Sequence, residues 1–258
     1  MKKFYIGYYN RIDLNNAIKK TLGIPNLILV VGVLLFVLIP VLLRDKIIPV
    51  QTDMSNVVLV KTDFGTGSAV YVGNGNSYLI TAAHVVSDME VGGVCSIEFQ
   101  DPNDMDNKIY AQANLLYKGN WNQNILSVEY WKEDYALLAV VNLNVKNYSD
   151  PCQIATNLSS VKVSDKISVE GYPNGVYSKN EGTINNVNGG FLKDKDFFIV
   201  DAGVWPGNSG GALLDVNKQL LGIVTNRGPA SSDFNGQVIV LKIDYVLKEL
   251  AKHGFVIN

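Results

Sequence analysis

The distribution of hydrophobic residues divides the chain into two parts that meet near residue 54. In the first part, residues 27–43 form a run of seventeen residues without a polar side chain. Extending this run back to Leu22 adds one polar interruption, Asn26, and a helix of twenty-two residues would span about 33 Å. Because the hydrocarbon core of a bilayer is about 30 Å thick, we predict a transmembrane helix over residues 22–43.

Two other interpretations of this apolar run are a buried helix of a soluble domain and a cleaved signal peptide. The flanking segments are too short to wrap a helix that is apolar on every side. A signal peptide has an apolar region of about 7–15 residues followed by small residues, and residues 41–46 contain no such cleavage site. An uncleaved signal anchor is therefore favoured.

The charges that flank the run predict its orientation. Five Lys or Arg residues precede it, whereas Arg44 and Lys46 closely follow it. Because basic residues favour the cytoplasmic side, residues 1–21 are expected to form a short cytoplasmic tail and residues 44–54 a linker. The remainder, residues 55–258, is expected to lie outside the cytoplasm, in the periplasm or the extracellular space.

From residue 55 onward, short β-rich runs alternate with turns rich in Gly, Asn and Asp, which indicates a sandwich or a barrel. About 200 residues of such structure are compatible with one large barrel or two small ones. Residues 73–76 are typical of a hairpin turn. One helix is predicted near the C-terminus, where apolar residues from Ile243 to Leu250 recur at helical spacing and Gly254 would end it. The predicted strands are Val57–Val60, Ser68–Val72, Ser77–Thr81, Ser96–Phe99, Ala136–Val141, Lys166–Glu170, Phe197–Val200, Leu220–Val224 and Val238–Lys242.

Composition and charge exclude several classes of function. The chain has 22 Lys and Arg against 24 Asp and Glu, and the part after residue 54 is net acidic, which argues against nucleic-acid binding. With two Cys and two His, a four-ligand zinc site would use all of them. Neither Gly65-Thr66-Gly67 nor the acidic residues 101–106 have the pattern of a phosphate or calcium loop. No cofactor and no metal are therefore expected.

The two cysteines are too few for a disulfide-rich scaffold. Cys95 alternates with Ile97 and Phe99 on one face of a predicted strand, so a buried free thiol is the expected state. A Cys95–Cys152 disulfide is the alternative if the domain lies in an oxidising compartment.

Candidate chemistry begins with a serine in a glycine-rich turn, Gly207-Asn208-Ser209-Gly210-Gly211. Such a turn lets a substrate approach the backbone and lets amide N–H groups face a developing oxyanion, although an ordinary turn is the alternative. A serine hydroxyl also needs a base at neutral pH. If Ser209 has a histidine base, His84, at the end of an apolar strand, is the only reasonable candidate, because the other histidine, His253, lies in the terminal helix. A satisfied core histidine is the more common role of a residue in such a place.

An acidic partner for the histidine would come from Glu133 or Asp134, which precede the apolar strand at Ala136. A carboxylate at the buried mouth of a strand can hold an imidazole in one tautomer and stabilise the imidazolium. A solvated acidic turn is the more common role of such residues. The residues themselves do not decide between Glu133 and Asp134.

The order His, Asp, Ser resembles that of trypsin-like serine proteases of the chymotrypsin fold, and most closely the bacterial HtrA or Deg type. Three motifs carry the resemblance: Thr81-Ala82-Ala83-His84, Asp134-Tyr135-Ala136-Leu137-Leu138 and Gly207-Asn208-Ser209-Gly210-Gly211. Further matches extend it over about residues 55–250: Gly65-Thr66-Gly67-Ser68, Gly171-Tyr172-Pro173 and Glu181-Gly182-Thr183-Ile184. The expected domain organisation is thus a trypsin-like protease domain over residues 55–258 behind the anchor.

This resemblance implies an all-β fold of two six-stranded antiparallel barrels with a C-terminal helix and a catalytic cleft between the barrels. His84 and Asp134 of the first barrel and Ser209 of the second would form the triad, with the amides of Gly207 and Ser209 as oxyanion hole. HtrA proteases normally carry PDZ domains after the protease domain, and none is expected here. Zymogen-activated relatives have Asp where this chain has Asn208, so activation by N-terminal cleavage is not expected.

The resemblance also places a primary specificity pocket between two segments. The expected walls are Gly203, Val204 and Trp205 on one side and Val224, Thr225 and Asn226 on the other. A charged substrate side chain would lack a partner there, apart from Arg227, at a cost of several kcal/mol. A small or medium aliphatic side chain would gain about 1.5–3 kcal/mol from burial. We therefore expect cleavage after residues such as Val, Ala or Leu.

The leading hypothesis is a membrane-anchored serine endopeptidase that acts on protein or peptide substrates, with protein quality control as its role. Its partners would be these substrates and the lipid bilayer, and not nucleic acid. The alternative is a protease-like module that binds partners without cleaving them.

Overall fold

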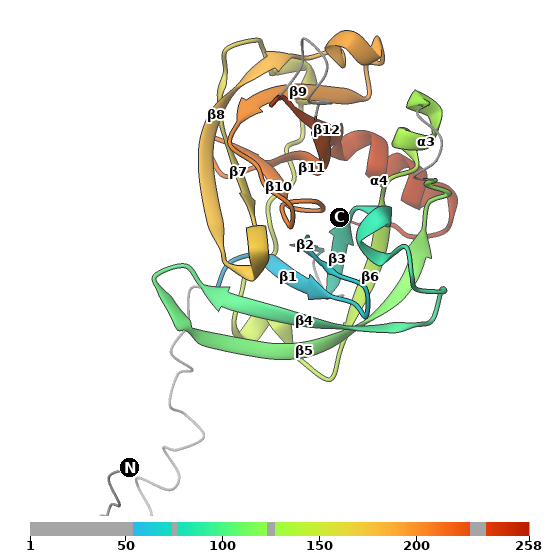
Figure 1. Ribbon diagram of the computed structural model, residues 1–258, viewed down its shortest axis with the longest axis vertical. Helices are drawn as coiled ribbons and strands as arrows, with labels where there is room; N and C mark the ends of the chain where they lie inside the picture. The colour runs from blue at the N-terminus through green and yellow to red at the C-terminus, as the bar shows by residue number, and fades with distance from the viewer. Residues whose placement is uncertain (1–53, 74–76, 123–126, 228–235, 258) are drawn as a thin grey trace, which may run out of the picture. The chain divides into compact units, whose positions relative to one another are not determined.

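The computed structural model describes residues 54–73, 77–122, 127–227 and 236–257. This part of the chain forms two closed barrels of six antiparallel strands each, followed by a C-terminal helix (Figure 1). The predicted architecture of two six-stranded barrels with a terminal helix is therefore confirmed.

The predicted transmembrane helix at residues 22–43 and its flanking segments 1–21 and 44–53 lie outside the described residues. Within the described ranges, no helix is both long and apolar enough to cross a membrane. The predicted hairpin turn is described only at Gly73, whose φ of +98° lies in the left-handed region.

The first barrel contains strands β1 to β6 in the order β1-β2-β3-β6-β5-β4. Alternate residues of a strand point to opposite faces, and one set of them, including Val58, Tyr71, Leu79 and Leu138, fills a core made by this barrel and its connecting segments. The strands are β1 (Val57–Lys61), β2 (Thr66–Val72), β3 (Tyr78–Thr81), β4 (Val94–Asp101), β5 (Asp104–Lys118) and β6 (Ala136–Val141).

The second barrel contains strands β7 to β12 in the order β10-β11-β12-β9-β8-β7. Its own core includes Val169, Phe198, Leu213 and Val240. The strands are β7 (Lys166–Gly171), β8 (Ser178–Asn186), β9 (Phe197–Ala202), β10 (Ala212–Asp215), β11 (Leu220–Arg227) and β12 (Val238–Lys242).

A third apolar core joins the two barrels and the C-terminal helix α4 (Ile243–Lys252). Val57 and Ile80 of the first barrel, Ile223 of the second and Val246 of α4 are all fully buried in it. Strands that are buried on both faces carry apolar residues at successive positions rather than at every second one. This explains the apolar runs Val57–Val60 of β1 and Leu220–Val224 of β11.

The helix α4 buries Ile243, Val246 and Leu250, and its last turn is followed by Gly254 with φ of +87°. The predicted helix and its glycine stop are therefore confirmed. The remaining helical segments are α3 (Val128–Lys132) and the 3₁₀ turns η1 (Ala83–Val86), η2 (Val145–Asn147), η3 (Leu158–Ser160), η4 (Pro173–Gly175) and η5 (Gly190–Leu192).

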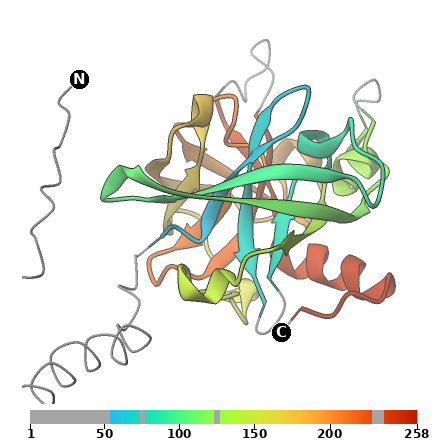
Figure 2. The same ribbon diagram turned by 90° about the horizontal axis from the view of Figure 1, so that it is seen from below.

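The strands β5, β8 and β10 were not predicted from the sequence, and of these only β10 is a short apolar segment. Figures 1 and 2 show β5 as part of a long ribbon with β4 along the outside of the first barrel. The first half of β5 has exposed or half-buried side chains at every position, and β8 buries only Ile184. These two polar stretches therefore lack the hydrophobic alternation by which half-buried strands are recognised. The second half of β5 does alternate, because Ile109, Ala111, Ala113 and Leu115 contact the core of the first barrel.

Cys95 and Cys152 are both buried free thiols. The expectation of a free thiol at Cys95 is confirmed, and the alternative disulfide is not formed. Burial is the main reason that the pKa of Cys95 is raised to about 11 and that of Cys152 to about 12. Both thiols are therefore protonated at neutral pH and behave as small apolar side chains.

Candidate active site

The turn that carries Ser209 connects β9 to β10 and has an unusual backbone. Gly207 has φ of +104° and Gly210 has φ of +80°, a region that side chains with a Cβ rarely adopt. A Cβ on Gly207 would also collide with the carbonyl oxygen of Tyr172, and one on Gly210 with that of Ser68. The glycines thus allow the turn to lie directly against the neighbouring backbone.

Two amides of this turn are free to bind a ligand oxygen. Within the described part of the chain, the N–H groups of Gly207 and Ser209 donate to no hydrogen bond. The carbonyl of Pro206 accepts a hydrogen bond from the N–H of Asn174 at 3.2 Å. Because C=O and N–H of a trans peptide point in opposite directions, the N–H of Gly207 is turned away from Asn174.

His84 is held by Asp134. The Nδ1 atom of His84 lies 2.8 Å from Oδ2 and 3.1 Å from Oδ1 of Asp134, and the backbone N–H of His84 donates to Oδ1 at 2.9 Å. Because an ionised carboxylate only accepts hydrogen bonds, the proton of the neutral ring lies on Nδ1. The lone pair of Nε2 is therefore available to accept a proton.

The local positions of these residues differ in part from the predicted ones. His84 lies in the 3₁₀ turn η1, three residues after the end of β3, and not at the end of the strand itself. Asp134, which is 2% exposed, reaches His84, whereas a carboxylate oxygen of Glu133 accepts a hydrogen bond from the N–H of Asn120 at 3.4 Å. Asp134, and not Glu133, is therefore the acid that contacts His84.

Burial and charge act in opposite directions on His84. Burial disfavours the imidazolium and lowers the pKa, but the negative charge of Asp134 and its hydrogen bond to the ring stabilise the imidazolium. The net result is that the pKa of His84 is raised above its ordinary value. His253, by contrast, lies after α4, where its Nε2 is 3.0 Å from the hydroxyl of Tyr117.

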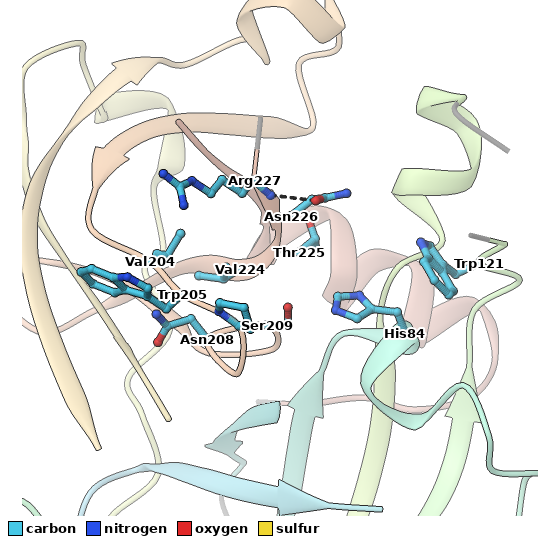
Figure 3. Close-up of a pocket in the computed structure, with 11 residues that line it drawn as sticks. His84, Trp121, Val204, Trp205, Asn208, Ser209, Val224, Thr225, Asn226 and Arg227 are labelled. Carbon is cyan, nitrogen blue, oxygen red and sulfur yellow. Dashed lines mark hydrogen bonds between the residues drawn. The ribbon is translucent and has the colours of Figure 1, made fainter. Parts of the chain in front are cut away.

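His84 and Ser209 line one pocket of about 410 Å³ (Figure 3). Five of the six residues expected to form a specificity pocket line it as well: Val204, Trp205, Val224, Thr225 and Asn226. Gly203 is not among the lining residues. The indole ring of Trp205 lies over Gly203, with its nearest carbon atoms 3.1 Å from the place that a Cβ would take.

Two polar side chains of this pocket, Thr225 and Asn226, are bonded to the protein itself. The hydroxyl of Thr225 donates to the carbonyl of Ile239 at 3.3 Å, and the side-chain oxygen of Asn226 accepts from the N–H of Arg227 at 2.8 Å. Figure 3 shows the guanidinium group of Arg227 directed away from Asn226. Val204 and Val224 are nearly fully buried and supply apolar wall.

Sequence reasoning missed Trp121, Pro206 and the contribution of Asn208 to the pocket wall. The ring of Trp121 lies 5.4 Å from that of His84, at 45° to it (Figure 3). The only local signal for Trp121 is that it is a single aromatic residue in a polar segment. Asn208 is 1% exposed, and its side-chain amide makes no hydrogen bond to any described residue.

Comparison with known proteins gives the class of this chain. The family model of the trypsin-like peptidase domain matches residues 66–223, which include the three motifs noted above. The chain belongs to this family. It is a serine endopeptidase.

Solved structures with the same fold are HtrA-type and related serine proteases. The Rv3671c protease of M. tuberculosis in its inactive form matches with a TM-score of 0.55 and 22% identity, over 84% of this chain and 96% of that chain. A serine endoprotease from Yersinia pestis matches with a TM-score of 0.54 and 23% identity, over 80% of this chain and 65% of that one. The HtrA-type protease AlgW, solved with a tripeptide, matches with a TM-score of 0.56 and 22% identity, over 79% of this chain and 62% of that chain. This chain thus spans less than two thirds of the latter two.

The contacts of His84 predict the pH dependence of the reaction. Attack by a serine requires a neutral imidazole, so kcat/KM should rise with pH through the pKa of His84. The midpoint should lie above the ordinary histidine pKa of about 6.5. Because Asp134 causes the increase, Asp134→Asn should move the midpoint to lower pH. Initial rates on a peptide substrate from about pH 5 to about pH 9 measure both, and a wild-type midpoint below 6.5 would contradict the prediction.

Proposed function

We propose that this chain is a membrane-anchored endopeptidase that hydrolyses peptide bonds through Ser209, His84 and Asp134. The hydroxyl oxygen of Ser209 attacks the substrate carbonyl, and Nε2 of His84 accepts the hydroxyl proton and then delivers it to the leaving amine. Asp134 holds the ring and stabilises the imidazolium. Water then hydrolyses the acyl-enzyme with His84 as base.

The amides of Gly207 and Ser209 are proposed to bind the oxyanion of the tetrahedral intermediate. Donors that are already oriented need no rearrangement at the moment of reaction, and such donors are worth about 10²–10³ in kcat each. The observation that carries the proposed catalytic function is the contact of 2.8 Å between His84 and the buried Asp134, beside the same pocket that Ser209 lines.

The pocket favours an aliphatic residue before the scissile bond. Val204 and Val224 supply apolar surface, and the oxygen atoms of Thr225 and Asn226 are already used in contacts within the chain. None of the described lining residues is acidic, so a Lys or Arg side chain would find no counter-charge. Val, Ala and Leu side chains would gain about 1.5–3 kcal/mol on burial.

Membrane anchoring rests on residues 22–43 and on the basic residues before them. The span would hold residues 55–258 on the far side of the membrane, in the periplasm or the extracellular space. A protease tethered there would act on membrane-proximal or unfolded secreted proteins, which fits a role in protein quality control.

The proposed triad is tested with the full chain and an unfolded protein substrate. Ser209→Ala should abolish cleavage, and Asp134→Asn should reduce kcat by on the order of 10⁴, because the ring loses the acceptor that fixes its tautomer. Rates are measured by release of labelled peptides.

The matched control for the acid is Glu133→Gln, which neutralises the adjacent carboxylate and should leave kcat almost unchanged. If Glu133→Gln caused the large loss and Asp134→Asn did not, the acid assignment would be wrong. Absence of any cleavage that depends on Ser209 would instead favour a module that binds proteins without cleaving them.

The pocket predicts the cleavage sites. A peptide library digested with the full chain should be cut mainly after Val, Ala or Leu, as read by mass spectrometry. Arg227→Gln should leave this profile unchanged, because the guanidinium group has no role in binding an aliphatic side chain. A profile dominated by Glu that disappears in Arg227→Gln would show that Arg227 reaches into the pocket, and dominance by Lys or Arg would also overturn the prediction.

The anchor predicts that the full chain remains in the membrane fraction after extraction at alkaline pH. Replacing Leu34 and Val37 together by Lys should release it, since each charge at a helix centre costs about 2.5–3.5 kcal/mol of insertion free energy. The control carries Leu34→Ile and Val37→Leu and should stay in the membrane. Release of the wild-type chain, or retention of the lysine variant, would rule out a spanning helix at residues 22–43.

A further inference from the structure

Ser68 is a polar residue in a buried stretch of strand, where an apolar side chain is expected. It lies in β2, where each of its neighbours from Gly67 to Val72 is buried, and it is itself fully buried. A buried hydroxyl is tolerated only where hydrogen bonds replace those to water. The partners of Ser68 therefore indicate why a hydroxyl is present.

Both partners of the hydroxyl belong to the second barrel, although Ser68 belongs to the first. The Oγ atom of Ser68 donates to the carbonyl oxygen of Gly207 at 2.7 Å and accepts from the N–H of Tyr172 at 2.9 Å. The backbone N–H of Ser68 in addition donates to the carbonyl of Ser209 at 2.8 Å. One residue of β2 thus contacts the active-site turn on both sides of Asn208.

The backbone at Ser68 is itself held firmly. The hydroxyl of Thr81, in the adjacent strand β3, donates to the carbonyl oxygen of Ser68 at 2.6 Å. β3 leads directly into the turn that carries His84. The hydroxyl of Ser68 is therefore fixed to the same part of the first barrel as the proposed base.

Three successive peptide groups of the turn have their carbonyl oxygens fixed, and Ser68 holds the middle one. The carbonyl of Pro206 accepts from Asn174, and that of Asn208 accepts from Gly211 at 2.8 Å. These two peptides carry the free N–H groups of Gly207 and Ser209. The peptide between them has its N–H bonded to the carbonyl of Trp205 at 3.0 Å and its oxygen bonded to Ser68.

We propose that Ser68 is a positioning residue that holds the peptide between Gly207 and Asn208, and thereby keeps the two oxyanion-binding amides aligned. This inference rests on the proposed function of those amides. Gly207, with φ of +104° and no side chain, has little steric resistance to rotation. A partner on its carbonyl therefore restricts rotation of the peptide that joins the two peptides with free N–H groups.

The inference is tested with Ser68→Ala in the full chain, beside Ser149→Ala as matched control. Ser149 is also a buried serine, and its hydroxyl bonds to the carbonyl oxygens of Ser55 and Asp150 at 3.3 Å, away from the turn. Loss of one oxyanion donor costs about 10²–10³ in kcat. Because Ser68→Ala would misalign such donors without deleting them, we expect kcat to fall about 10- to 100-fold, with KM nearly unchanged.

A second measurement distinguishes misaligned oxyanion donors from a general loss of structure or substrate binding. The affinity of a peptide boronic acid, whose tetrahedral adduct places an oxygen at the oxyanion site, should fall in parallel with kcat. The affinity of an uncleaved peptide substrate, measured in Ser209→Ala with and without Ser68→Ala, should not change. If both affinities fall equally, or if Ser68→Ala equals Ser149→Ala in kcat, the inference is wrong.

Ser68→Cys covers the case in which Ser68→Ala does not fold. A thiol is a weaker donor of similar shape, so kcat should fall to a value between those of wild type and Ser68→Ala, and a kcat equal to that of wild type would overturn the inference. Ser209-dependent cleavage by the wild-type chain is measured first. Its absence would overturn the proposed function, and this inference with it, whereas a kcat of Ser68→Ala equal to that of wild type overturns this inference alone.

Discussion

The packing of the first barrel against the second is the constraint on which the site depends. His84 and Asp134 belong to one barrel and Ser209 to the other, so their relative positions are determined by the contact between the barrels. An apolar core shared by both barrels contributes to this contact, and apolar burial is not directional. Direction comes from a few hydrogen bonds across the interface, such as that from the Tyr172 hydroxyl to the carbonyl of Val57 at 3.1 Å.

The hydrogen bonds between His84 and Asp134 stabilise the buried carboxylate and also orient the imidazole ring. A carboxylate that is 2% exposed is stable only with hydrogen-bond donors, and among the described residues its donors are the ring and the backbone N–H of His84. These bonds also fix the ring and leave Nε2 free. The pair is therefore interdependent, because loss of the His84 ring removes one of the two donors to the buried carboxylate, and loss of Asp134 removes the acceptor of the ring Nδ1.

Much of the fold and the central residues of the site could be predicted from the sequence. The segments Val57–Val60 of β1 and Leu220–Val224 of β11 are buried and form apolar runs, whereas β8 is polar and gives no such signal. The site residues Ser209 and His84 lie in distinctive motifs. The roles of Trp121 and Ser68 could not be predicted, because they depend on contacts between distant segments. Ser68 and Gly207 are separated by 139 residues, and no local sequence pattern predicts their contact.

The order of the strands along the chain has a consequence for biosynthesis. The first barrel occupies residues 57–141, so His84 and Asp134 are synthesised well before the second barrel, at residues 166–242. Domains fold as units as they emerge from the ribosome. The turn at Ser209 is completed only when β11 and β12 follow, since the N–H of Gly210 donates to Val224 of β11 and β12 pairs with that strand. A nascent chain thus carries only half of the candidate site until β11 and β12 have been added.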